Sequence, residues 1–91
     1  MKNFRELIVW QKAHQLVLLI YKLTKVFPAE EKFNLISQIR RAATSIPTNI
    51  AEGCGKFTHK DFARYLQNAQ GSSQELEYLS FLSFELDYLT Q

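Results

Sequence analysis

The stretch QIRRAATSIPTNIAEG, Gln38–Gly53, decides how this chain folds. Its apolar residues recur at helical spacing, yet Pro47 stands inside the pattern, where proline costs about 3 kcal/mol by removing a hydrogen bond and crowding the preceding turn. We therefore predict a kinked helix that packs closely against its neighbours. Its apolar face comprises Leu35, Ile36, Ile39, Ala42, Ala43, Ile46 and Ile50.

Small residues on this helix predict a close approach to the helix that follows. A short connection would place Ala42 and Ala43 level with Ala69, and Arg40 near Gly71. The Ala43 carbonyl, which Pro47 deprives of its donor, would need a new one. The candidate donors are Ser45, Thr48 and Asn49.

Residues typical of helix starts and ends divide the chain into three predicted helices, over about 4–26, 31–53 and 58–89. Asn3 begins the first as an N-cap, Pro28 ends it, Gly53 ends the second, and Thr58 caps the third. The first stripe is Leu7, Trp10, Ala13, Val17, Ile20 and Tyr21, and the third is Phe62, Leu66, Ala69, Ser73 and Leu76. The fold class is all-α, an antiparallel up-and-down helical bundle in one domain, 1–91.

The amino-acid composition is that of a small globular protein. The chain has 91 residues and is 46% hydrophobic and 22% charged, which suits a globular domain with a thin margin of stability. No apolar run reaches the roughly 18 residues of a membrane-spanning helix, and the start does not resemble a secretory signal. A single cysteine, Cys54, cannot form an internal disulfide, so we expect a cytoplasmic protein.

Charge is distributed unevenly along the chain. Residues 1–64 carry eleven Lys and Arg against five acids, whereas residues 65–91 carry four acids and no base. This polarity is typical of a surface that faces nucleic acid, and equally of two ends that attract copies of the same chain.

The segment YLSFLSFELDYL, Tyr78–Leu89, is apolar almost all round, and an all-round apolar helix must be buried. The first two helices are too short to cover it. We therefore expect the chain to associate with a second copy here.

Four stretches in order, VWQKA (9–13), LTKVFP (23–28), QIRRAATSIPTNIAEG (38–53) and DFARYLQNAQGSSQELE (61–77), resemble one family. It is the bacterial four-helix-bundle family often encoded in intervening sequences of 23S ribosomal RNA genes. The resemblance implies an antiparallel bundle that assembles into a ring, commonly a pentamer. It also implies kinship with accessory proteins of diversity-generating retroelements, which bind nucleic acid through a basic surface. Family members continue into a fourth helix. By this resemblance, Leu86–Gln91 lies where the connection to that helix would be, and the fourth helix is missing from the sequence.

The candidate nucleic-acid-binding residues are arginines and lysines, because Arg binds phosphate bidentately and stays charged. The alternative for Arg40 and Arg41 is an ion pair with Glu75, and for the lysines a solvated face. The set is Arg40, Arg41, Lys56, Lys60 and Arg64.

The candidate oligomer interface combines aromatic residues with a polar stripe on the second helix. The stripe comprises Gln38, Arg41, Ser45, Thr48, Asn49 and Glu52. The stripe lacks long lysines, which favours a surface covered by another subunit over one that faces water. Six aromatic residues could stack on bases, but at helical spacing such residues belong more often to a core or interface. They are Trp10, Tyr65, Tyr78, Phe81, Phe84 and Tyr88. The predicted set is Arg41, Asn49, Glu52, Tyr78, Phe81, Phe84 and Tyr88.

We identify no catalytic residue, metal ligand or cofactor site. The stretch GCGKFT, 53–58, lacks the pattern of a phosphate loop, having Ile50 and Phe57 where glycine and a hydroxyl residue are required. Cys54 and His59 could form a nucleophile and base, but nothing supplies an oxyanion hole. We expect a non-enzymatic, self-associating bundle that binds RNA or DNA, or alternatively a scaffold without a nucleic-acid role.

Overall fold

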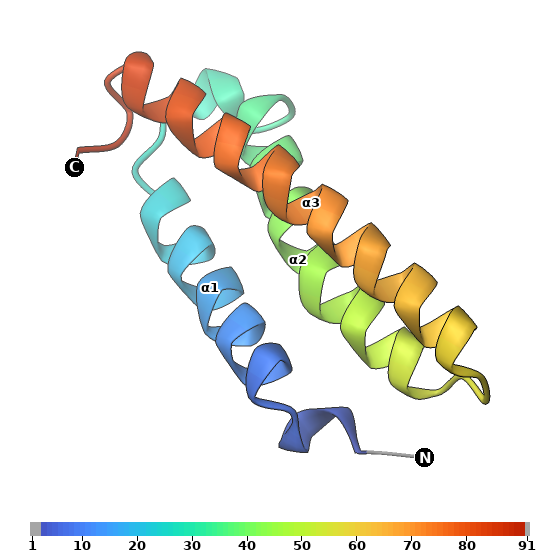
Figure 1. The fold of residues 1–91 in the computed structure, drawn as a ribbon. Coiled ribbons are helices and arrows are strands. Elements are labelled where there is room, and N and C mark those ends of the chain that lie inside the picture. Colours follow the sequence, from blue (N-terminus) through green and yellow to red (C-terminus); the bar gives the residue numbers. More distant parts are fainter. Residues whose placement is uncertain (1–2, 91) are drawn as a thin grey trace.

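The structure, a computed structural model, describes residues 3–90 and is all-α. A 3-10 turn, η1 (Phe4–Glu6), leads into α1 (Ile8–Thr24), and a second 3-10 turn, η2 (Ala29–Glu31), precedes α2 (Leu35–Cys54). Helix α3 (His59–Glu85) completes an up-and-down arrangement with no strand in the described part of the chain (Figure 1). This confirms the predicted helical class. Within the same residues, no helix is long and apolar enough to cross a membrane.

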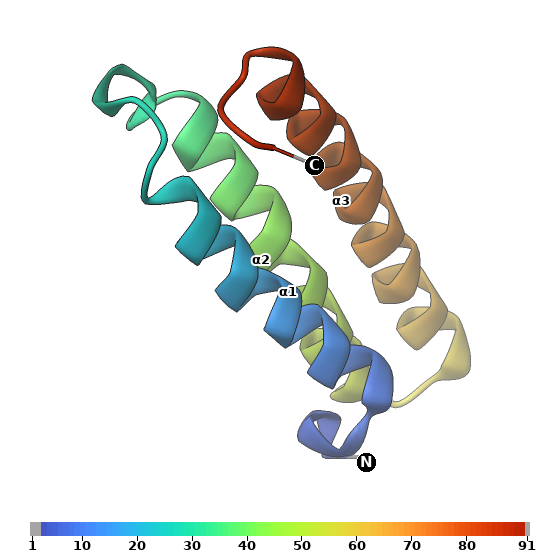
Figure 2. The ribbon, with the colours of Figure 1, turned by 90° about the vertical axis from the view of Figure 1, so that its left-hand side faces the viewer.

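Helix α2 lies at the centre of the arrangement. Both α1 and α3 pack against α2, while no pair of Cα atoms joins α1 directly to α3 within 8 Å. Figures 1 and 2 show the two outer helices flanking α2. The buried core comprises Ala13, Ile20, Phe27, Leu35, Ile39, Ala42, Ala43, Ile46, Ile50, Ala69, Leu76 and Leu79.

The predicted apolar face of α2 is confirmed. Six of its seven members are buried, and Ile36 is partly buried against the core. Ala42 and Ala43 are only 2% and 0% exposed, because their small side chains let neighbouring backbones lie close. Residues at a period of 3.6 share one face of a helix, so this part of the core follows directly from the sequence.

Pro47 is buried, and α2 continues through it as one α-helix. The expected donors do not turn to the Ala43 carbonyl. Thr48 Oγ1 donates to the Thr44 carbonyl at 2.7 Å, and Asn49 Nδ2 donates to the Ser45 carbonyl at 2.8 Å. Each side chain reaches the carbonyl four residues back, the group closest to it on the helix surface. The bend at Pro47 stays a prediction.

The register between α2 and α3 differs from the predicted one. Ser72 Oγ donates to Ser45 Oγ at 2.8 Å, and Gly53 lies against Tyr65. Ala69 is therefore about level with Thr48, more than one helical turn from Ala42 and Ala43. The loop and its glycines set this register, and spacing within one helix does not reveal it.

The first two helices begin later than predicted. Asn3 does act as an N-cap, since its Oδ1 accepts a hydrogen bond from the Arg5 N–H at 3.0 Å. However, it caps η1, and Leu7 is extended (φ −77°, ψ 127°), so α1 starts at Ile8 rather than near residue 4. Likewise, residues 29–31 form η2, and Asn34 has a non-helical backbone (φ −127°, ψ −98°), so α2 begins only at Leu35.

Helix α3 ends at Glu85 instead of continuing to residue 89. Asp87 adopts the left-handed conformation with φ 64°. The N–H groups of Tyr88 and Asp87 donate to the carbonyls of Ser83 and Phe84, each at 2.9 Å, which is a Schellman motif. Glycine usually occupies the left-handed position after a helix. Because aspartate occupies it here, the sequence contains no recognisable signal for the end of α3.

The buried stripe of α3 is partly different from the predicted one. Ala69 and Leu76 are buried as expected, and Leu79 and Ser83 join them. Leu66 remains 37% exposed, and Ser73 faces solvent while Ser72 reaches α2. The stripe alternates steps of three and four residues, so an error of one residue in register moves a side chain off the face.

Candidate functional site

Arg40 is fixed by the end of α1. Its Nε donates to Thr24 Oγ1 at 2.9 Å and its Nη2 to the Tyr21 carbonyl at 3.4 Å. Its Cζ atom lies 4.5 Å from the centre of the Tyr21 ring. A cation at this position satisfies orphan carbonyls and complements the negative end of the helix dipole. Arg40 therefore joins α1 to α2.

The predicted ion pair with Glu75 is wrong within the chain for both arginines, and a pair between neighbouring chains stays a prediction. No ion pair between residues 3 and 90 contains Arg40, Arg41 or Glu75. The register explains this result, since Arg40 turns toward α1 while α3 lies on another side of α2. Arg41 and Glu75 are both exposed.

Two of the predicted cations lie beside Tyr65, at the end of the bundle where α2 meets α3, and a third lies in the first turn of α3. Lys56 Nζ lies 5.1 Å and Arg64 Cζ 5.2 Å from the centre of the Tyr65 ring. Lys60 and Arg64 line one shallow hollow of about 350 Å³ on α3. We call Lys56, Lys60, Arg64 and Tyr65 the basic cluster.

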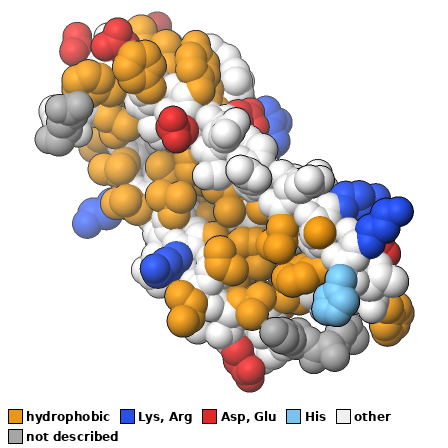
Figure 3. All heavy atoms as spheres, viewed as in Figure 1, with side chains coloured by type: hydrophobic (Ala, Val, Ile, Leu, Met, Phe, Trp, Pro, Cys, Tyr) orange, Lys and Arg blue, Asp and Glu red, His pale blue; other side chains and the backbone are white. Residues whose placement is uncertain are grey.

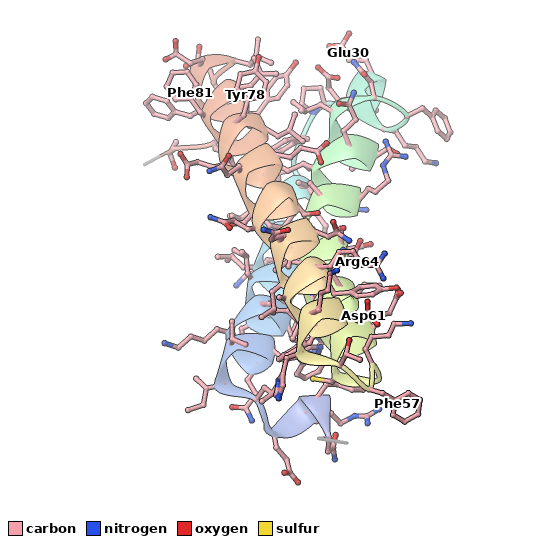
Figure 4. The ribbon with its side chains drawn as sticks, turned by 45° about the vertical axis from the view of Figure 1, so that its right-hand side comes forward. Glu30, Phe57, Asp61, Arg64, Tyr78 and Phe81 are labelled. Carbon is pink, nitrogen blue, oxygen red and sulfur yellow. The ribbon has the colours of Figure 1, made fainter. Side chains whose placement is uncertain are left out.

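One acid lies at the edge of the basic cluster. Arg64 Nη2 is 3.6 Å from Asp61 Oδ1, one helical turn away, and the two side chains are 64% and 47% exposed (Figure 4). Exposed pairs of this kind contribute about 0–1 kcal/mol, so the pair leaves Arg64 available to a stronger anion. Arg41 is separate, about four turns away along α2.

The predicted interface residues of α2 lie in different settings. Glu52 is exposed and lines a groove of about 380 Å³ between α2 and the N-terminal part of the chain. Asn49 is half-buried, and its amide donates to the Ser45 carbonyl at 2.8 Å and to Ser45 Oγ at 3.1 Å.

The end of α3 exposes the aromatic side chains predicted there. Tyr78, Phe81 and Phe84 are 60%, 59% and 37% exposed. Tyr78 and Phe81 project outward from α3 in Figure 4 and border a shallow hollow with Gln74 and Glu77. On the face shown in Figure 3, further hydrophobic side chains gather between α1 and α3, and the basic side chains lie mostly toward the edges. Only one side of the segment is buried, through Leu79 and Ser83.

Tyr88, also predicted to be at the interface, folds back onto its own chain. Its ring centre lies 5.3 Å from that of Phe27, and its hydroxyl donates to Glu31 Oε2 at 3.0 Å. The hydrogen bond to Glu31 raises the pKa of Tyr88 above the usual 10.0, with smaller contributions from desolvation and from the charges of Glu31 and Glu30. Tyr88 thereby ties the end of α3 to η2.

Cys54 and His59 border one hollow of about 210 Å³ at the α2–α3 loop. No hydrogen bond between them occurs in the described structure, which also holds no group of three His, Cys, Asp or Glu side chains suited to a metal ion. Gly53 lies inside α2 and Gly55 is the C-cap with an ordinary φ of −82°. The GCGKFT stretch is thus a helix end and its loop.

Sequence reasoning missed several partners of these residues. Tyr65 was considered only as a stacking aromatic, although a tyrosine one residue after Arg64 and near Lys56 was a usable signal. Thr24 and the Tyr21 carbonyl were missed as partners of Arg40, and no local pattern indicates them. The near-complete exposure of the Phe33 and Phe57 side chains, at 88% and 95%, was also not predicted.

Comparison with known proteins identifies the family of this chain. A sequence search of curated proteins finds no match. The model of the family described as 23S rRNA-intervening sequence protein matches residues 5–91, nearly the whole chain. The chain therefore belongs to the 23S rRNA-intervening sequence protein family.

Proposed function

We propose that this protein is a non-enzymatic, self-associating helical bundle that binds RNA or DNA through the basic cluster. The observation that carries this proposal is the placement of Lys56 and Arg64 beside the half-buried Tyr65, with Lys60 in the same hollow as Arg64. Arg41 would extend the contact along α2, whereas Arg40 is engaged with α1 and serves the fold.

The chemistry of the cluster supports a polyanionic ligand. Cations that neutralise phosphates release condensed counterions, which supplies most of the affinity of sequence-independent binding. Asp61 is the only acid that forms an ion pair within residues 3–90, and that pair is weak because it is exposed. A nucleic-acid phosphate that approaches Arg64 would compete with Asp61 for the guanidinium.

Self-association is supported by the exposed apolar end of α3. Full burial of an exposed Phe side chain contributes on the order of 1.5–3 kcal/mol. Tyr78, Phe81 and Phe84 are 60%, 59% and 37% exposed, so each would gain a part of this on burial. Exposed apolar clusters on this scale are typical of protein contacts. A ring, commonly a pentamer in the resembled family, is the form of assembly that we propose.

Salt dependence tests nucleic-acid binding. Lys60→Glu combined with Arg64→Glu should weaken binding to RNA or DNA and reduce the slope of log K against log salt by about 1.8, or about 0.9 per lost phosphate contact on duplex DNA. Lys12→Glu combined with Lys22→Glu, on the exposed surface of α1, is the matched control with the same change in net charge. Equal losses in the two double variants would show that net charge, and not this cluster, governs binding.

A second candidate function is a scaffold that binds protein and has no nucleic-acid role. The exposure of Tyr78 and Phe81, at 60% and 59%, favours it. Phe81→Lys combined with Phe84→Lys should dissociate the assembly if α3 forms the contact. An assembly that depends on these residues but has no salt-dependent affinity for RNA or DNA would favour the scaffold.

A further inference from the structure

Phe57 is an apolar side chain with almost no contact in its own chain. It lies at the tip of the α2–α3 loop, is 95% exposed and points away from the bundle (Figure 4). Its neighbour Lys56 is exposed, and Lys60 follows within the first turn of α3. Phe57 is therefore an exposed aromatic side chain flanked by the basic residues Lys56 and Lys60, and we call it the knob.

The groove beside α2 has complementary properties. Its aromatic wall is ordered: the Trp10 ring stacks on His14 with centroids 5.1 Å apart and an interplanar angle of 7°, and Phe4 meets Trp10 edge-on at 5.0 Å. The opposite wall comes from α2. The remaining lining residues are Val17, Thr44, Pro47, Thr48, Ala51 and Glu52.

The groove is mainly apolar and has a volume of about 380 Å³, which lies within the usual range for pockets that hold organic groups. Glu52 is its only carboxylate and is exposed at the rim. His14 is the other titratable side chain that borders it. An aromatic ring that entered the groove would meet the Trp10 ring, and a cation beside that ring would meet Glu52.

We propose that Phe57 of one copy inserts into this groove of a second copy, with Lys56 placed against Glu52. The inference rests on the self-association proposed above and names one contact that sustains it. Knob and groove are different surfaces of the same chain, so the contact can repeat head-to-tail from copy to copy, and this arrangement generates a ring when the rotation closes. A buried aromatic anchor of this kind contributes a large share of binding energy, while the remaining interface excludes water around it.

Charge complementarity selects Phe57 over the chain's other exposed phenylalanine. Phe33 lies near Glu30 and Glu31, and Lys32 Nζ already lies 5.3 Å from the centre of its ring. Entry of Phe33 into the groove would bring these acids toward Glu52. Phe33 therefore provides a matched control.

The test measures self-association by sedimentation equilibrium in the absence of nucleic acid. Phe57→Ser and the groove-filling Thr48→Tyr should each raise the dissociation constant at least about tenfold, whereas Phe33→Ser should leave it unchanged. The helical spectrum of each variant confirms folding. Lys56→Glu and Glu52→Lys should each weaken association, and the double exchange should restore most of it.

Three results would overturn the inference. Unchanged association in Phe57→Ser and Thr48→Tyr would exclude this contact and leave the proposed self-association intact. An equal loss in Phe33→Ser would show that general exposed hydrophobicity is responsible. A wild-type chain that stays monomeric up to high micromolar concentration would refute both the contact and the self-association on which it rests.

Discussion

Replacing Gly53 with alanine tests the close approach of α2 to α3. A Cβ atom at this position would lie 2.8 Å from Phe62 Cδ1 and 2.9 Å from Tyr65 Cβ, closer than real Cβ atoms come to their neighbours. The Phe62 ring can turn aside, but Tyr65 Cβ is attached directly to the backbone. Overpacking of this kind costs about 1–3 kcal/mol.

Gly71 provides the matched control, because it also lies in a helix but a Cβ atom added there would meet nothing within 4 Å. Alanine is favoured over glycine inside a helix by about 0.8–1.0 kcal/mol. Gly71→Ala should therefore stabilise the protein by about that amount. In Gly53→Ala the same gain, smaller near the helix end, is offset by the steric cost, which leaves a net loss of up to about 2 kcal/mol.

The assay is thermal and urea unfolding of the two variants at one protein concentration, since association shifts the apparent stability. We expect Gly71→Ala to be more stable than Gly53→Ala by about 1–3 kcal/mol, and each kcal/mol corresponds to about 4–8 °C in Tm for a domain of this size. If Gly53→Ala were as stable as Gly71→Ala, the tight helix contact at Gly53 would be refuted.

Three further predictions concern single side chains. Arg40→Ala should lower the free energy of unfolding, measured in urea, by about 1.5–3 kcal/mol, because the Thr24 hydroxyl loses a charged donor. Arg41→Ala, at an exposed position, should change it by less than about 0.5 kcal/mol. Equal effects of the two variants would contradict the contact of Arg40 with the end of α1. Protonated Tyr88 stabilises the fold fully below pH 10, and this stabilisation is lost as the pH rises through the raised pKa of Tyr88. The free energy of unfolding of the wild type should therefore fall with pH in the alkaline range. Tyr88→Phe should reduce this pH dependence, whereas Tyr78→Phe should not. Asp87→Gly should raise stability by up to about 1 kcal/mol, because glycine adopts φ 64° without steric cost, and an unchanged or lower Tm would argue against the left-handed cap.

The sequence by itself determined the helical class and the buried face of α2. Periodicity and helix caps act over a few residues, so Thr58 could be assigned as the N-cap of α3, where its Oγ1 accepts from the Asp61 N–H at 3.1 Å. Ala42 and Ala43 could likewise be assigned to the core from their spacing alone. The same reasoning grouped Lys56, Lys60 and Arg64, because they lie close together in the sequence.

The tertiary structure decided which helix each polar side chain meets. Arg40 reaches Thr24, sixteen positions earlier, and its partner depends on the packing of α1 against α2. The length of the α2–α3 loop sets the register that places Ser45 against Ser72. The end of α3 depends on Tyr88 docking against η2, which stabilises an aspartate in a conformation that it rarely adopts alone. Contacts between distant segments carry no local period, and their energies appear only when the helices are assembled.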